Sequence, residues 1–146
     1  MLNRYRQLSS IEKRALWAAL PRLAIARLSL LTGVMSARRW LGGEITIQRA
    51  PVASVDLQPW KQRALALKRA SRIIPDSHCL AQSLALRWWM RRHGLNAEAV
   101  IGVRRDAARG ESHAWVMLDG EPIGEASDIL SQYVIIFPRH MVDIEC

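Results

Sequence analysis

The stretch that decides the fold is Ser77–Gly94, with the sequence SHCLAQSLALRWWMRRHG. Pro75 and Asp76 interrupt what precedes it, and Ser77 is suited to cap the free N–H groups of a helix start. Gly94 suits the left-handed position just after a helix end. Between these signals the sequence is apolar on nearly every side, which predicts a central, largely buried helix.

Cys79 lies in the first turn of this predicted helix. Free N–H groups and the positive end of the helix dipole stabilise a thiolate there, so we expect a lowered thiol pKa and a nucleophile. The alternative is that Cys79 is one more small buried apolar residue, because free cysteine is among the most buried residue types. A histidine that faces the thiol would decide between the two interpretations.

His113 opens a predicted strand, 112–118, downstream of the helix. An imidazole on a strand that faces a helix start can take the thiol proton and form a thiolate–imidazolium pair. The alternative for this residue alone is a half-buried strand histidine bonded to backbone. Of the other histidines, His78 points away from its neighbour's side chain, His93 is a cation at a helix end, and His140 lies in the C-terminal tail.

A third, acidic group is needed to orient the imidazole, and strand pairing selects it. A three-residue loop at 118–120 with a left-handed Gly120 would place His113 opposite Glu125, with Cβ atoms about 5 Å apart. A two-residue turn would instead put Glu125 on the other side of the sheet. We therefore expect Glu125 to orient His113, with Asp128 as the alternative acid.

The composition fits one domain and excludes several classes of protein. The chain has 146 residues and two cysteines, so we expect no disulfide framework, and no Cys/His spacing suggests zinc. We expect no cofactor, and a reducing cytoplasm suits a cysteine nucleophile. The formal net charge of +8 fits an acidic peptide or protein partner, while no zinc finger or aromatic-basic RNA motif indicates binding to nucleic acid.

The order of the predicted elements indicates an α+β fold. Helices are expected at 11–40 and 57–73, with a short strand at 44–48 between them. After Gly94 the apolar period changes to two, which predicts an antiparallel sheet. Its strands are expected at 97–104, 112–118, 121–125 and 133–137. We divide the chain into a helical N-terminal region, 1–56, and a catalytic core, 57–146.

The apolar segment 11–40 begins with a capping box at Ser9 and Glu12 and ends at Gly42-Gly43. Arg22 and Arg27 inside it argue against a membrane span, because each costs about 3 kcal/mol near a bilayer centre. We expect a helical hairpin, kinked or split at Pro21, that packs on the catalytic core. The alternative is a role at a membrane surface or in docking a partner.

Several motifs together resemble the lasso-peptide B-protein protease, a family of the transglutaminase-like cysteine-enzyme superfamily. The motifs are Cys79–Leu86 (CLAQSLAL), Arg91–Gly94 (RRHG), Ile101–Arg104 (IGVR), His113–Val116 (HAWV) and Asp119–Gly120. The resemblance covers 75–125. It implies a transglutaminase-like or papain-like fold with a Cys–His–acid triad, in which the acid of the family is usually Asp.

The resemblance also implies a function and partners. Proteases of this family remove the leader peptide from a ribosomally made precursor peptide, which frees the N-terminal amine of the core. A separate asparagine-synthetase-like cyclase then joins this amine to an Asp or Glu side chain. The family often occurs as two chains, and this chain has room for the protease half only. A small leader-recognition protein is therefore the implied partner.

Two other functions stay open from the sequence. The same site could transfer the acyl group to an amine, as a transglutaminase or N-acyltransferase does, because both reactions share the acyl-enzyme. A non-enzymatic scaffold could instead bind the precursor or a membrane with its basic helices. Within the enzyme interpretations, the Cys79 N–H is the expected first oxyanion donor, and Gln58, Trp60 and Gln62 are candidates for the second.

Overall fold

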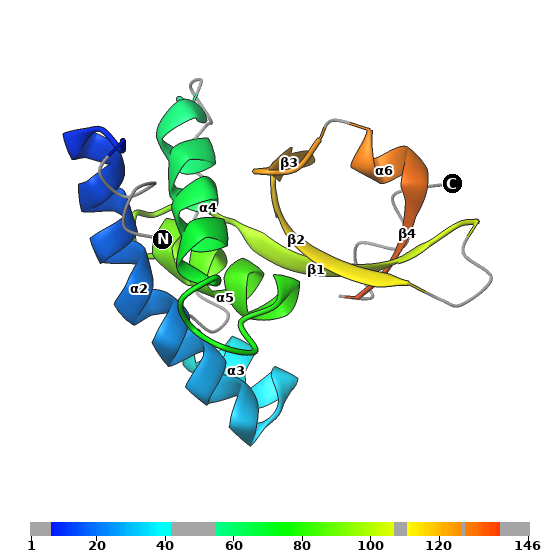
Figure 1. The fold of residues 1–146 in the computed structure, drawn as a ribbon. Coiled ribbons are helices and arrows are strands. Elements are labelled where there is room, and N and C mark those ends of the chain that lie inside the picture. Colours follow the sequence, from blue (N-terminus) through cyan, green and yellow to red (C-terminus); the bar gives the residue numbers. More distant parts are fainter. Residues whose placement is uncertain (1–6, 42–54, 107–110, 127, 138–146) are drawn as a thin grey trace.

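The computed structural model describes residues 7–41, 55–106, 111–126 and 128–137 (Figure 1). The predicted strand at 44–48, the helix end at Gly42-Gly43 and the tail residue His140 lie outside these ranges. Helices α2, α4 and α5 form one layer, and α5 is the helix that packs most closely on a four-stranded antiparallel sheet. This architecture confirms the predicted α+β class.

The elements follow the predicted order. The helical segments are α2 (Ser10–Ser29), the 3-10 helix η1 (Leu30–Thr32), α3 (Val34–Trp40), α4 (Gln58–Ala70), α5 (Cys79–Arg91) and α6 (Ile129–Gln132). The strands are β1 (Glu98–Arg104), β2 (Ser112–Leu118), β3 (Glu121–Ile123) and β4 (Tyr133–Phe137). The sheet has the order β3-β2-β1-β4, so β1 and β2 are central.

The predicted capping box opens α2. The Ser9 N–H donates to Glu12 Oε2 at 2.9 Å, and the Glu12 N–H donates to Ser9 Oγ at 3.2 Å. The expected split at Pro21 is wrong, because the helix continues through it. Pro21 lies on the exposed side of α2, where water can reach the carbonyl that loses its N–H partner. The helical run is instead divided at Gly33, whose φ of +97° no other residue type adopts readily.

The segment Ser10–Thr32 is long and apolar enough to cross a membrane by length and composition, the one such segment in the described ranges. Its buried residues, which include Leu16, Leu23 and Ala26, belong to the core formed with α4 and α5. Core helices of soluble proteins can be equally long and apolar. The opposite side of α2 exposes apolar side chains, with Trp17 at 64% and Leu28 at 63%.

Helix α5 is central and largely buried, as predicted, but Ser77 is not its cap. The Ser77 hydroxyl faces the Pro75 carbonyl, and His78, in an extended conformation with no side-chain bond to the helix, is the N-cap residue. The helix therefore begins at Cys79, and no capping side chain occupies its first N–H groups. Gly94, at φ +80°, follows its C-terminal end as expected.

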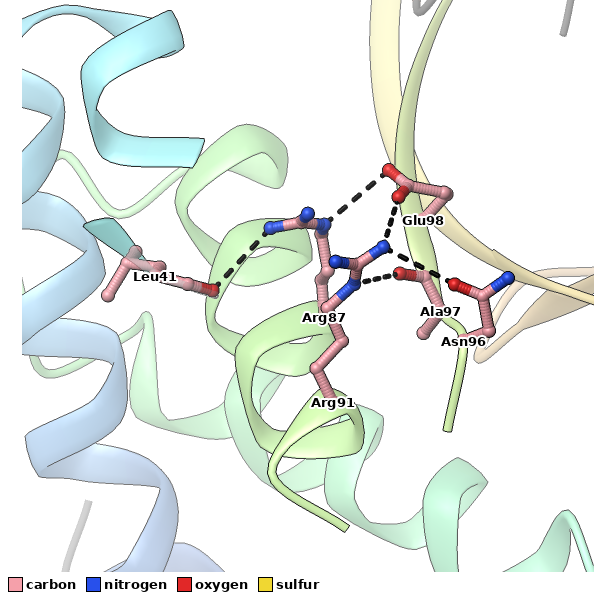
Figure 2. Close-up of polar contacts among 6 residues, drawn as sticks. All are labelled: Leu41, Arg87, Arg91, Asn96, Ala97 and Glu98. Carbon is pink, nitrogen blue, oxygen red and sulfur yellow. Dashed lines mark hydrogen bonds and ion pairs between the residues drawn. The ribbon is translucent and has the colours of Figure 1, made fainter. Parts of the chain in front are cut away.

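A buried ionic cluster joins α5 to β1 (Figure 2). Glu98 accepts from Arg91 Nη2 at 2.5 Å and lies 3.5 Å from Arg87 Nε. Arg91 also donates to the Ala97 carbonyl, and Arg87 donates to the Leu41 carbonyl at the end of α3. The cluster fixes the C-terminal half of the central helix against the first strand of the sheet.

The hairpin between β2 and β3 differs from the expected one. Asp119 and Gly120 have φ values of +49° and +86°, and Leu118 pairs with Glu121. These values and this pairing define a two-residue turn, so the predicted three-residue loop is wrong. Strand β3 also ends at Ile123 rather than at residue 125, because Gly124 turns the chain with a φ of +79°.

Candidate active site

A cavity lies between α4, the start of α5, β2 and the segment that follows β3. Its volume is about 310 Å³. Cys79, His113 and Glu125 all line it, and apolar side chains such as Leu67 and Ile123 line the remainder. The three residues expected to form the site are thus brought into one cavity.

Cys79 is the first residue of α5 and is half-buried. A hydrogen bond with His113 lowers the pKa of its thiol, and the backbone N–H groups of Ala114 and Leu80 lower it further. Burial acts in the opposite direction but does not prevail. The Ser83 hydroxyl donates to the Cys79 carbonyl at 2.7 Å, which ties the first turn together.

His113, near the start of β2, has a pKa raised to about 9, first by the hydrogen bond with Cys79 and then by that with Glu125. Its Nε2 lies 3.5 Å from Glu125 Oε1, so Nδ1 is the ring nitrogen available to the thiol. The lowered thiol pKa and the raised imidazole pKa both favour the form of the pair in which Cys79 is a thiolate and His113 an imidazolium.

Two aromatic rings hold the imidazole from the side. The His113 ring stacks on Trp115, with centroids 6.0 Å apart and planes 20° apart. The ring centroid of Tyr133, on β4, lies 5.8 Å from that of His113 and 5.9 Å from that of Trp115. Trp115 is fully buried, so its packing in the core restricts the movement of the ring on which His113 stacks.

Glu125 is mostly buried. Burial disfavours its ionisation, but hydrogen bonds from His113 and Lys68 lower the pKa of its carboxyl below the usual value. Lys68 Nζ lies 2.9 Å from Glu125 Oε1 and donates to the Gly124 carbonyl at 2.9 Å. The carboxylate therefore lies between two cations, one on α4 and one on β2.

Glu125 reaches His113 by a route other than the expected strand pairing. The two-residue turn would put it on the wrong side of the sheet if β3 continued. Because β3 ends at Ile123 and Gly124 is left-handed, the chain leaves the sheet and turns the carboxylate back toward the imidazole. A Cβ at Gly124 would overlap Ala64 of α4, so only glycine allows this approach.

Asp128, the alternative acid, lies elsewhere. It is exposed, and its Oδ2 accepts from Gln132 Nε2 at 2.7 Å within α6. His78 is exposed beside the nucleophile, and His93 packs edge-on against Trp60 at the far end of α5. These residues do not line the cavity.

The residues considered for the second oxyanion donor are also outside this cavity. Trp60 contacts His93 at the opposite end of α5 from Cys79, and Gln62 lines a separate cavity between α2 and α4. Gln58 is in the first turn of α4, whereas the last turns of that helix face Cys79. Gln82, one turn into α5, lines the cavity and donates to the Ser77 carbonyl at 3.0 Å.

Two charged residues of the cavity lining were missed from the sequence, Lys68 and Arg72. Lys68 shares one side of α4 with Ala64, and Arg72 follows in the turn after the helix; the spacing of four residues is the only signal the sequence offers. No group of three or more His, Cys, Asp or Glu side chains is arranged to hold a metal ion within the described ranges.

A cysteine with a lowered thiol pKa at a helix start, a histidine on a neighbouring strand and a carboxylate in contact with that histidine have the arrangement of a cysteine enzyme. Residues 15–137 match the family model of the Transglutaminase-like superfamily, and the chain belongs to this superfamily. Membership indicates a cysteine peptidase or an acyltransferase. No curated protein and no solved structure matches the chain.

Proposed function

We propose that the chain is a cysteine peptidase that removes the leader from a lasso-peptide precursor. The observation that carries the peptidase assignment is the grouping of Cys79, His113 and Glu125 in one cavity, with the thiol pKa lowered and the imidazole pKa raised. The motifs that resemble the lasso-peptide B-protein protease support the choice of substrate. The partners in this proposal are a small leader-recognition protein and an asparagine-synthetase-like cyclase.

The first half of the proposed reaction is acylation. The Cys79 thiolate attacks the scissile carbonyl carbon, and the carbonyl oxygen takes the electron pair. The Cys79 N–H, free at the start of α5, donates to this oxyanion. His113 then gives its proton to the leaving nitrogen as the C–N bond breaks, which releases the core peptide with a free amine.

Deacylation restores the site. His113, now neutral, takes a proton from water as the water oxygen attacks the thioester carbon. The C–S bond breaks, the leader leaves as a carboxylate, and the thiolate–imidazolium pair forms again. Glu125 holds the ring orientation through both halves and stabilises the imidazolium.

The direct test is incubation of the chain with a precursor peptide and the leader-binding partner in ¹⁸O-labelled water. Peptidase action predicts a core with a free amine and a leader with one labelled carboxylate oxygen, both visible by mass spectrometry. Transfer to an added amine would give a leader amide without label and would support the acyltransferase activity instead. An intact precursor would favour the non-enzymatic scaffold.

Replacing the acid should separate the two carboxylates considered. Glu125→Gln is expected to lower the kcat of cleavage by about 10²-fold or more, because the imidazolium loses its charged partner. Asp128→Asn should leave kcat within about twofold, since the Asp128 carboxylate accepts from Gln132 of α6 and does not line the cavity. Kinetics with both variants, each checked for folding by circular dichroism, measure this. The reverse ranking of the two variants would overturn the assignment of Glu125.

The thiol should react over an unusual pH range. Iodoacetamide is expected to alkylate Cys79 rapidly well below a pH of about 8.5, where free thiols ionise, because the pair already holds a thiolate. Cleavage should decline above a pH of about 9, where His113 loses the proton needed by the leaving amine.

His113→Ala is the control for this titration. Without the imidazole the largest cause of the lowered thiol pKa is lost, so the alkylation profile should move toward that of glutathione. A wild-type profile that already coincides with glutathione would contradict the ion pair.

A further inference from the structure

Lys68 connects helix α4 to the acid of the site at two points. Its ammonium lies 2.9 Å from Glu125 Oε1 and 2.9 Å from the Gly124 carbonyl oxygen. One turn earlier on α4, the methyl group of Ala64 lies where a Cβ of Gly124 would be. The segment that carries the acid thus rests on α4 through one close backbone contact and one cation.

This support replaces the one that a β-strand would give. Strand β3 ends at Ile123, so no ladder hydrogen bond to β2 fixes the position of Glu125. The carboxylate has no strand partner opposite it and would otherwise rotate freely about its side-chain bonds. Lys68 and His113 both contact the Glu125 carboxylate, and both contacts are made to Oε1.

The charged groups around Glu125 come from three elements. Lys68 lines the cavity from α4, with Arg72 in the turn that directly follows this helix, His113 from β2 and Cys79 from α5. Of the cations, Lys68 lies nearest to the carboxylate, at 2.9 Å against 3.5 Å for His113 Nε2. Oε1 contacts both nitrogens, so the Lys68 contact restricts the positions that this oxygen takes relative to the ring.

We propose that Lys68 is a positioning residue, which fixes the Glu125 carboxylate against His113 and acts on the reaction only through it. The proposal rests on the proposed function in one respect, that Glu125 orients His113. Lys68 does not contact the thiol in the described structure, and its side chain is 44% exposed, so its replacement leaves the core intact.

The test is the titration of His113 itself, followed by NMR in the full-length chain. The signals of the four histidines are assigned with a His113→Gln variant. Lys68→Met is expected to lower the pKa of His113 by about one unit or more, as Glu125→Gln does, because the carboxylate moves away from the ring. Lys68→Arg should keep the pKa near the wild-type value, since a guanidinium can hold the same oxygen.

The direction of the shift separates positioning from simple proximity of charge. If Lys68 were only a nearby cation, its removal would relieve repulsion of the imidazolium and raise the pKa of His113. Lys61→Met is the matched control, because Lys61 is exposed on the same helix and does not line the cavity. It should leave the titration unchanged.

Each outcome has one meaning. A His113 pKa that is unchanged or raised in Lys68→Met, but lowered in Glu125→Gln, overturns the role of Lys68 and leaves the triad in place. A pKa unchanged in Glu125→Gln overturns the triad and, with it, the role of Lys68. In cleavage assays, Lys68→Met should lower kcat about tenfold with little change in KM, and Lys68→Arg should restore most of it.

Discussion

Cys79→Ala is expected to abolish leader cleavage, with a loss of kcat of about 10⁴-fold or more, because the residue supplies the only proposed nucleophile. The fold should persist. The change removes a single sulfur atom from a half-buried position at a helix start, and alanine is a good helix residue. Mass spectrometry of a precursor incubated with the variant and the partner measures the loss.

Cys146→Ala is the matched control, since it makes the same chemical change at the other cysteine of the chain. It should cleave at the wild-type rate. Circular dichroism and thermal unfolding establish that the Cys79 variant is folded. Cleavage at a near wild-type rate by folded Cys79→Ala would end the cysteine peptidase proposal.

Glu98→Gln should have the largest effect on stability. The substitution keeps the shape of the side chain but leaves Arg87 and Arg91, both almost fully buried, without the carboxylate that lies between them (Figure 2). Breaking a buried ion pair in this way costs about 3–5 kcal/mol, a large part of the 5–15 kcal/mol that stabilises a typical domain. Urea unfolding followed by tryptophan fluorescence measures the difference.

Glu111→Gln provides the comparison. Glu111 pairs with Arg104 at 3.2 Å, but both side chains are exposed, so solvent screens the interaction. We expect no measurable change in its unfolding midpoint. If Glu98→Gln shifted the midpoint no further than Glu111→Gln, the ionic cluster would not be what joins α5 to β1.

The sequence was sufficient for the elements that local signals define. The bounds of β2 and β4 were predicted to the residue, because β2 lies between a polar loop and the Asp119-Gly120 turn, and β4 is a β-branched and aromatic run that Pro138 ends. The capping box at Ser9 and the left-handed Gly94 were also found, since both depend on neighbouring residues only.

The turn at Asp119-Gly120 could not be chosen from its own residues. Both loop lengths use a left-handed Gly120, and aspartate tolerates a positive φ. The tertiary structure decides, because the observed register pairs Ile123 with Val116, and both belong to the core beneath the helices. The other register would have paired Ile123 with Trp115, which lies in the core on the opposite side of the sheet.

The acid of the site shows the limit of pattern reasoning in another way. Glu125 was expected beside His113 and lies there. The argument from the alternation of side chains between the two faces of the sheet was wrong, because β3 ends at Ile123 and the alternation ends with it. The contact with Lys68 spans more than fifty residues of sequence. No spacing rule reaches across such a separation, so the support that α4 gives to the acid was visible only in three dimensions.

The stacking of Tyr133 beside His113 bears on the size of the smallest active fragment. No residue of β4 lines the cavity, so a truncation after Glu125 would retain every cavity-lining side chain. It would nevertheless remove the Tyr133 ring that packs against the imidazole, together with the strand that pairs with β1. We therefore expect the smallest active fragment to extend through Phe137, which is also where the match to the superfamily ends.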